Sequence, residues 1–87
     1  MTKDEFNKQL GDFIKTEREK RNWSQAELAS KMGNNFQNIS RLERGEVSPT
    51  LFWLDKLAKV FDKLSSEFIS DFELFIALSE KQKNGKG

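Results

Sequence analysis

Five polar side chains suited to recognition by hydrogen bonds cluster between residues 35 and 44 of this chain. They are the amides Asn35, Gln37 and Asn38 and the guanidinium groups of Arg41 and Arg44. An amide can pair with adenine through two hydrogen bonds, and a guanidinium can do the same with guanine. The same residue types are also ordinary on the solvent side of a helix, so their meaning depends on the elements that hold them.

Side chains for covalent or acid–base catalysis are scarce. The sequence has no cysteine and no histidine, which excludes disulfides, thiolate metal sites and imidazole catalysis. Carboxylates and lysines remain, but they are scattered at helical spacings with opposite charges beside them, as on a solvated surface. We therefore expect no enzymatic activity, no metal and no cofactor.

Length and charge limit the kind of protein further. The chain has 87 residues, enough for one domain around one shared core. Its net charge is +1, with six basic and four acidic residues from Arg18 to Glu46 but three basic and six acidic ones from Asp55 to Glu80. A surface for phosphate is therefore expected in the first half. No apolar run is long enough for a bilayer and no signal-peptide core follows Met1, so we expect a cytoplasmic protein.

Helix signals indicate which elements hold the clustered side chains. An apolar stripe at steps of three and four residues predicts a first helix over about residues 3–21. The string Ser24-Gln25-Ala26-Glu27 is a capping box, in which serine and glutamate satisfy each other's free backbone donors, and it begins a second helix. Gly33 is the expected end of that helix, because glycine adopts the left-handed conformation at the lowest cost.

A third helix carries the amides and arginines. Asn35 is its expected cap and Gly45 its expected end. Thr50 and Ser65 are the expected caps of a fourth and a fifth helix. The segment 24–44 is thus two short helices joined by a glycine turn, the arrangement of a helix-turn-helix, whose second helix can enter a DNA major groove.

The C-terminal part of the chain gives a more ambiguous signal. Apolar residues within 71–80 fit helix spacing and also strand alternation, and we favour a helix. Residues 81–87 are polar and contain glycine, so we expect a disordered tail. The domain itself is expected to cover residues 1–70, with 71–80 as a short apolar extension.

Several positions, in order along the chain, form a wider pattern. They are Ser24-Gln25-Ala26-Glu27-Leu28-Ala29, Gly33, Ile39-Ser40-Arg41-Leu42-Glu43-Arg44-Gly45, Pro49 and Leu57-Ala58-Lys59. This pattern resembles the phage-repressor/Cro, or XRE-type, helix-turn-helix family over roughly residues 10–69. The resemblance implies an all-α, compact five-helix, lambda-repressor-like domain that binds operator DNA and usually represses transcription. Glu17 and Asn34 depart from the pattern, because many members carry apolar residues there, and the segment after Ser70 lies outside it.

The resemblance also implies roles for individual residues. Base edges would be contacted from the third helix by Asn35, Phe36, Gln37, Asn38 and Arg41, with Gln37 suited to adenine and Arg41 to guanine. Phosphates would be contacted by Ser24, Gln25, Arg44 and Ser48. Arg18 and Glu43 are expected to form a structural ion pair. Two alternatives stay open: Phe36 packs within the protein or against a symmetry partner, and Ser24 serves only as a cap.

Dimerisation is expected because one such unit covers only one half-site. A homodimer would place two recognition helices about 34–36 Å apart on one face of double-stranded DNA, which requires a palindromic operator. The candidate dimerisation residues are Phe68, Phe72, Phe75 and Ile76. Packing of these side chains against the first helix, through Phe6 and Leu10, explains them equally well.

Other functions are compatible with the same pattern. An antitoxin, or a controller protein of a restriction–modification system, would use the same DNA-binding module as a free-standing repressor. A protein-interaction adaptor that has lost DNA binding would also fit, and the low net charge and Phe36 at a reading position agree with it. The expectation we carry forward is a dimeric, sequence-specific transcriptional repressor.

Overall fold

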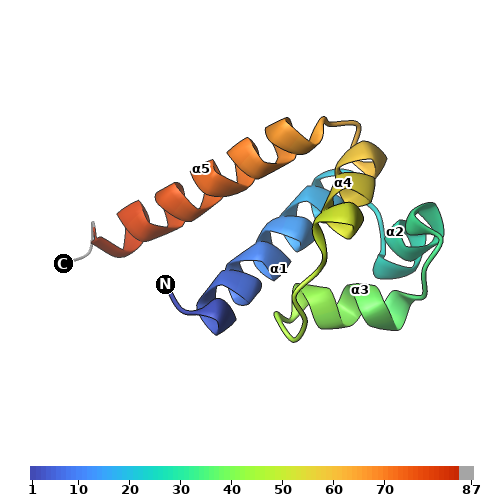
Figure 1. Cartoon of the computed structure of the whole chain (residues 1–87), viewed down its shortest axis with the longest axis horizontal. Helices are drawn as coiled ribbons and strands as arrows, with labels where there is room; N and C mark the ends of the chain where they lie inside the picture. Colours follow the sequence, from blue (N-terminus) through green and yellow to red (C-terminus); the bar gives the residue numbers. More distant parts are fainter. Residues whose placement is uncertain (85–87) are drawn as a thin grey trace.

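The computed structural model describes residues 1–84, with side chains through Lys81, and this part of the chain forms five α-helices and no strand (Figure 1). The helices are α1 (Lys3–Lys20), α2 (Gln25–Met32), α3 (Phe36–Glu43), α4 (Leu51–Val60) and α5 (Ser65–Asn84). The predicted all-α, five-helix fold is therefore confirmed. Among the described helices, none combines the length and the apolar character that a bilayer span requires.

The starts of the helices follow local sequence. At each of the first four, a side-chain oxygen accepts the backbone N–H three residues later at 3.0–3.1 Å, and these caps are Thr2, Ser24, Asn35 and Thr50. The prediction that Ser65 caps α5 is wrong. The Glu67 carboxylate accepts the backbone N–H of Leu64 instead, at 3.0 Å, and the Ser65 hydroxyl bonds to the Asp55 carboxylate.

The ends of the same four helices share one geometry. A residue in the left-handed region follows each helix, and these residues are Asn22, Gly33, Gly45 and Asp62. The next backbone N–H then returns to the carbonyl five residues earlier, at 2.9–3.3 Å. This closure satisfies carbonyls that the helix itself leaves free. It also turns the chain sharply, so the connections between helices are short.

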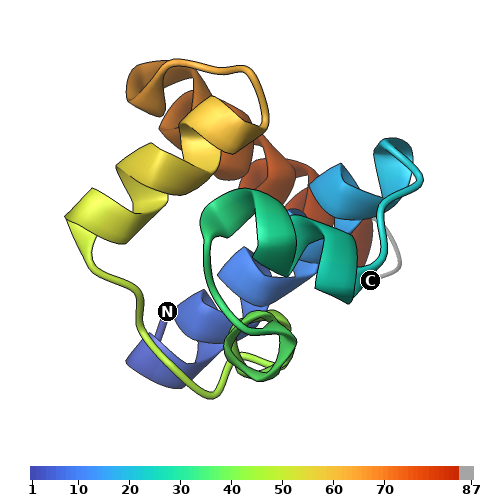
Figure 2. The same cartoon turned by 90° about the vertical axis from the view of Figure 1, so that its right-hand side faces the viewer.

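Helix α1 is the central element, with α3 packed on one side and α5 on the other (Figure 1). Seen from the end of the molecule, α3 lies below α2 and is viewed along its axis (Figure 2). Gly11 allows the contact between α1 and α3, since a Cβ there would lie 2.5 Å from the carbonyl oxygens of Leu42 and Glu43. The shared core consists of Leu10, Phe13, Ile14, Leu28, Ala29, Met32, Ile39, Leu42, Leu57, Ala58, Phe61, Phe68 and Phe72.

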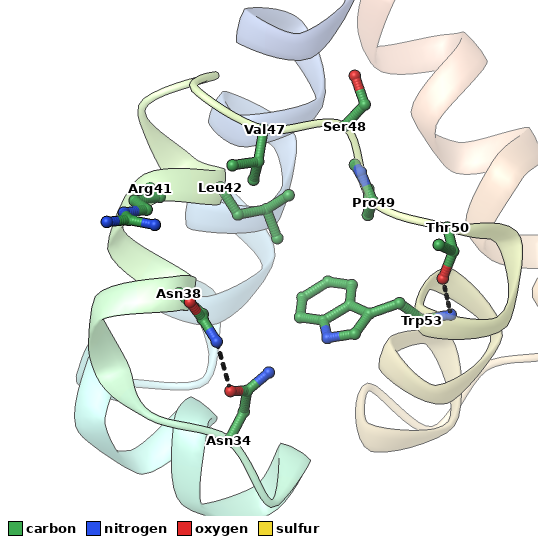
Figure 3. A pocket seen from close by; sticks show the side chains of 9 residues that line it. All are labelled: Asn34, Asn38, Arg41, Leu42, Val47, Ser48, Pro49, Thr50 and Trp53. Carbon is green, nitrogen blue, oxygen red and sulfur yellow. Dashed lines mark hydrogen bonds between the residues drawn. The ribbon is translucent and has the colours of Figure 1, made fainter.

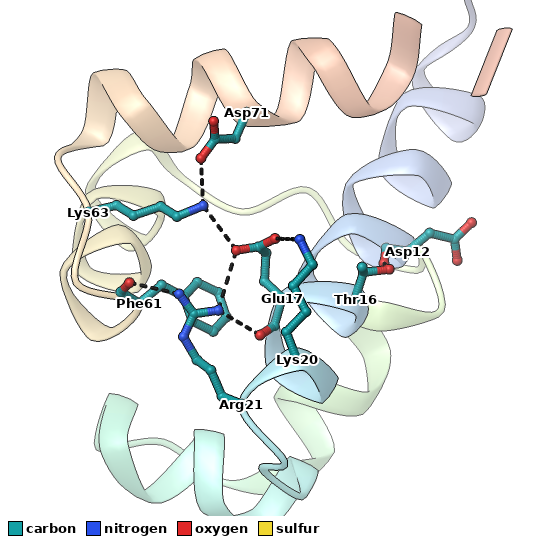
Figure 4. A network of polar contacts seen from close by, with 8 residues as sticks. All are labelled: Asp12, Thr16, Glu17, Lys20, Arg21, Phe61, Lys63 and Asp71. Atoms are coloured by element: carbon teal, nitrogen blue, oxygen red, sulfur yellow. Dashed lines mark hydrogen bonds and ion pairs between the residues drawn. The ribbon is translucent and has the colours of Figure 1, made fainter. Parts of the chain in front are cut away.

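A polar network joins α1 to the start of α5 (Figure 4). The Glu17 carboxylate, in a residue only 4% exposed, contacts Lys20 at 3.0 Å, Arg21 at 3.3 Å and Lys63 at 2.9 Å. Lys63 also contacts Asp71 of α5 at 2.5 Å. Burial alone would raise the pKa of Glu17, but hydrogen bonds and charges from Lys63 and Lys20 lower it overall. Glu17 thus occupies an interior position as a carboxylate because cations compensate it.

Helix α5 continues without interruption through the expected boundary at residue 70. The segment 71–80 is helical, as favoured, and the prediction of disorder is wrong for residues 81–84, which belong to α5. The rest of the expected tail, 85–87, lies outside the described residues. The helix extends further because apolar residues at helical spacing keep one side of α5 against α1 as far as Ile76.

The four aromatic and aliphatic residues considered for dimerisation divide between interior and surface. Phe68 and Phe72 are buried in the chain's own core. Phe72 meets Phe6 edge to face, with ring centroids 5.3 Å apart, so packing against the first helix accounts for it. Phe75 and Ile76 are partly buried against the same core and partly open to solvent.

Candidate nucleic-acid interface

The outer side of α3 presents the side chains expected to read bases. Ile39 and Leu42 anchor the helix in the core, while Phe36, Gln37 and Arg41 are exposed. Within the described part of the chain, Gln37 and Arg41 make no hydrogen bond and no ion pair. Their amide and guanidinium groups are therefore free to bind an external partner. Phe36 is 54% exposed, so the structure places it on the surface instead of the core.

Two of the expected base readers already have intramolecular roles. The Asn35 side chain caps α3 by accepting the Asn38 backbone N–H at 3.0 Å. The Asn38 side-chain amide donates to the Asn34 side chain at 2.7 Å, and Asn34 also accepts the Asn35 N–H at 2.9 Å. Asn34, which departs from the family pattern, thus ties the turn to the start of α3. These bonds leave Gln37 and Arg41 as the freest polar groups on α3.

A groove of about 280 Å³ separates the back of α3 from the start of α4 (Figure 3). The Trp53 indole extends into it from α4 and faces Leu42, with Val47 and Pro49 on the connecting loop. Arg41 leaves α3 on the side away from Trp53 in this view. Arg41 is thus directed to the outer side of α3, whereas the groove lies behind it.

The start of α2 holds two residues expected at phosphates. Ser24 caps the helix, and its own backbone N–H is accepted by the Glu27 carboxylate at 3.0 Å. Gln25 is half-buried, and its side-chain amide donates to the Glu43 carboxylate at 3.0 Å. The first backbone N–H groups of α2, at Gln25 and Ala26, have no partner within the described residues. Free donors at a helix start suit an anion.

Arg18 and Glu43 lie beside this helix start and form a buried ion pair. The Arg18 guanidinium donates twice to the Glu43 carboxylate, at 2.7 and 3.0 Å. A third bond, at 2.7 Å, joins Arg18 to the Trp23 carbonyl just before α2. One guanidinium therefore connects α1, the start of α2 and the end of α3.

The end of α3 and the following loop carry the other two expected phosphate contacts. Arg44 is exposed but paired with Glu46 at 2.6 Å, and it also contacts the Ser40 hydroxyl. The hydrogen bond with Arg44 lowers the pKa of Glu46. Ser48 exchanges two hydrogen bonds with the Asn7 amide, at 2.8 and 3.1 Å, which ties the loop to α1. A phosphate at Arg44 would have to displace Glu46.

Sequence reasoning did not identify several residues that shape this face. Gly11 sets the distance between α1 and α3, Asn7 anchors the loop, and Glu46 occupies Arg44. The only signal available was indirect: a glycine within the apolar stripe of the first helix, and an acidic residue directly after the end of α3. Among the described residues there is no group of three or more histidine, cysteine or carboxylate side chains arranged to hold a metal ion.

An exposed helix with free polar groups, packed across a second short helix through a glycine turn, defines a helix-turn-helix protein. The helix-turn-helix model named HTH_3 matches residues 14–69 of this chain, which is more than half its length. The chain belongs to this family, which is the XRE-type group that the sequence resembles. Family membership and the solved relatives described next support a DNA-binding transcription regulator.

Two solved structures are similar to the chain. An HTH_3 family transcriptional regulator from Vibrio cholerae is 31% identical, with a TM-score of 0.71 over 84% of this chain and 42% of the regulator. The chain therefore spans less than half the length of that regulator. The clp gene regulator ClgR from Corynebacterium glutamicum shares the fold, with a TM-score of 0.77 and 19% identity over 91% of this chain and 84% of ClgR. No curated protein matches the chain in sequence.

Proposed function

We propose that this protein is a sequence-specific transcriptional repressor that binds a palindromic DNA operator as a homodimer and catalyses no reaction. The observation that carries the proposal is the outer side of α3. Gln37 and Arg41 are exposed there without intramolecular partners, on a helix fixed from behind by Ile39, Leu42 and the Arg18–Glu43 pair. A rigid helix with free amide and guanidinium groups is suited to a major groove.

The proposal assigns different roles to the polar residues of the face. Gln37 reads adenine and Arg41 reads guanine, each contributing roughly 1–3 kcal/mol of discrimination. Phe36 contacts a thymine methyl group. The start of α2, with Gln25, and the end of α3, with Arg44, contact phosphates and orient the protein without selecting sequence.

Selection of bound duplexes from a random library tests the proposal directly. The wild type is expected to enrich a palindromic consensus whose half-sites lie about one helical turn apart. Gln37→Ala and Arg41→Ala are then each expected to lose preference at one position per half-site, with affinity for the best site falling about 5- to 100-fold. A reporter placed behind the selected site should be less active when the protein is present.

Lys59→Ala is the matched control for Arg41→Ala. It removes one positive charge from α4, where Lys59 pairs with Asp55 on a side chain that is exposed. The control should keep the consensus unchanged. A wild type that enriches no sequence above salt-sensitive background binding would contradict the proposal.

A further inference from the structure

We infer that the buried Arg18–Glu43 pair is a positioning pair for DNA binding, because it holds the Gln25 side-chain amide with one N–H directed toward a phosphate site. The inference rests on the proposed function and concerns its backbone contacts. Three residues from three helices carry it: Arg18 of α1, Gln25 of α2 and Glu43 of α3. The sequence alone indicates only a structural role for the pair.

The geometry fixes Glu43 before it fixes Gln25. Arg18 donates to both carboxylate oxygens of Glu43, at 2.7 and 3.0 Å, so the carboxylate cannot rotate without breaking a charge-assisted bond. The same guanidinium donates to the Trp23 carbonyl at 2.7 Å, immediately before the start of α2. Arg18 therefore sets both the acceptor and the helix start that lies against it.

Glu43 in turn determines which way the Gln25 amide faces. An ionised carboxylate only accepts hydrogen bonds, so it requires the NH2 side of the Gln25 amide and rejects the carbonyl side. One N–H bonds to the Glu43 carboxylate at 3.0 Å. The second N–H has no acceptor within the described residues, and it lies at the helix start with the free backbone N–H groups of Gln25 and Ala26. These three donors converge on one anion.

The neutral amide has a particular value at this place. Glu27 is bound to the Ser24 backbone N–H at the same helix start, and its negative charge opposes a phosphate. The positive charge of Arg18 is compensated by Glu43 inside the protein. Gln25 thus supplies a donor without a charge, and its contribution depends on orientation alone. If orientation is what the ion pair provides, removing the pair removes the contribution of Gln25.

A double-mutant cycle on DNA affinity tests this dependence. Gln25→Ala in the wild type is expected to weaken binding about tenfold for every sequence, with the salt dependence unchanged because no charge is lost. The combined change Arg18→Met with Glu43→Leu removes the pair without altering net charge and leaves no unpaired buried ion. In that background, Gln25→Ala is expected to change affinity less than about twofold.

The control removes the other buried ion pair. Glu17→Leu with Arg21→Met is also neutral in charge, and both residues lie on α1 in contact with α4 and α5 residues instead of α2. DNA affinity should remain within about twofold of the wild type, although both double variants lose some thermal stability. If Gln25→Ala costs the same in both backgrounds, Glu43 does not position Gln25 and the inference is wrong.

A measurement on the free wild type keeps the test independent of variants that fold poorly and of DNA binding itself. In NMR spectra, the two side-chain amide protons of Gln25 should differ, one protected from exchange with water by Glu43 and the other exposed. Two equally fast exchanging protons would overturn the inference. Failure of library selection with protected exchange would reject only the proposed function, since the held amide would still be present.

Discussion

Glu17 shows how a single residue can depart from an apolar pattern without disrupting the interior. Its carboxylate lies against the core of α1 but is surrounded by Lys20, Arg21 and Lys63. Lys63 is itself affected: burial lowers its pKa, but bonds with Asp71 and Glu17 raise it overall. The network therefore stabilises the fold only while both signs of charge are present, between acid and alkaline limits.

Glu17→Gln tests the acid limit. The pKa of Glu17 in the folded protein lies below its ordinary value of 4.5, so its contribution is complete above that pH and is lost as pH falls through the folded value. At pH 7 the variant should lose about 1–3 kcal/mol of unfolding free energy. The difference should shrink toward zero as the pH falls well below 4.5.

Denaturant unfolding between pH 7 and pH 3 measures this difference. Glu80→Gln, an exposed glutamate on α5, is the control and should match the wild type at every pH. A Glu17→Gln difference that stays constant across the range would show that its hydrogen-bonding shape, and not its charge, is what matters.

At the scale of elements, the contact between α1 and α3 depends on the missing side chain of Gly11. Gly11→Ala would place a methyl group 2.5 Å from two backbone carbonyl oxygens of α3, and backbone cannot move aside as a side chain can. The variant is expected to lose at least about 1–3 kcal/mol of unfolding free energy. DNA affinity should fall as well, because α3 must shift.

Thermal and denaturant unfolding provide the measurement, and Asp12→Ala provides the control. Asp12 is the next residue on α1 and is exposed, so an alanine there should be close to neutral. Stability of Gly11→Ala equal to that of the wild type would mean that α1 and α3 separate without cost.

The elements differ in how far sequence determines them. Caps such as Ser24 and Asn35, and the glycine ends, act within five residues, so the pattern alone predicts most helix boundaries. The Gly11 contact and the Asn7–Ser48 bonds join residues more than 30 positions apart. No local pattern announces them. For the same reason, exposure of Gln37 and Arg41 was predictable from helix spacing, but the partner of Gln25 was not.

At the scale of the whole molecule, α5 is longer than the core requires. Phe68 and Phe72 are buried against α1, yet Leu74 and Leu78 are 59% and 53% exposed on the same helix. They border the partly buried Phe75 at a surface that also includes Thr16 and Lys20 of α1. Apolar side chains in such positions are stable in water only at a cost. We therefore place the proposed dimer contact at Leu74, Phe75 and Leu78, with Ile76 at its edge.

Leu74→Asp combined with Leu78→Asp tests this contact. Sedimentation equilibrium is expected to show a dimer dissociation constant raised at least about tenfold, since two buried leucines would become charged. The melting temperature of the monomer should change little, because both side chains are exposed within one chain. The same concentration range without DNA serves for wild type and variant.

Leu51→Asp is the control on a different surface. Leu51 is 74% exposed at the start of α4, so it changes the same chemistry away from α5. The control should dimerise like the wild type. A wild type that remains monomeric at high concentration, or a Leu51→Asp variant that dissociates while the α5 variant does not, would contradict the placement of the dimer contact.

The eight residues of α3 limit how much information one chain can extract from DNA. A helix of that length is about 12 Å long and runs beside roughly four base pairs, which distinguish only about 256 sequences. Two copies reading one site would raise that number to about 65,000, still below the 10⁶ or more competing sites in a genome. Addressing a single gene therefore demands a second copy and, beyond it, the shape of DNA that α3 never touches.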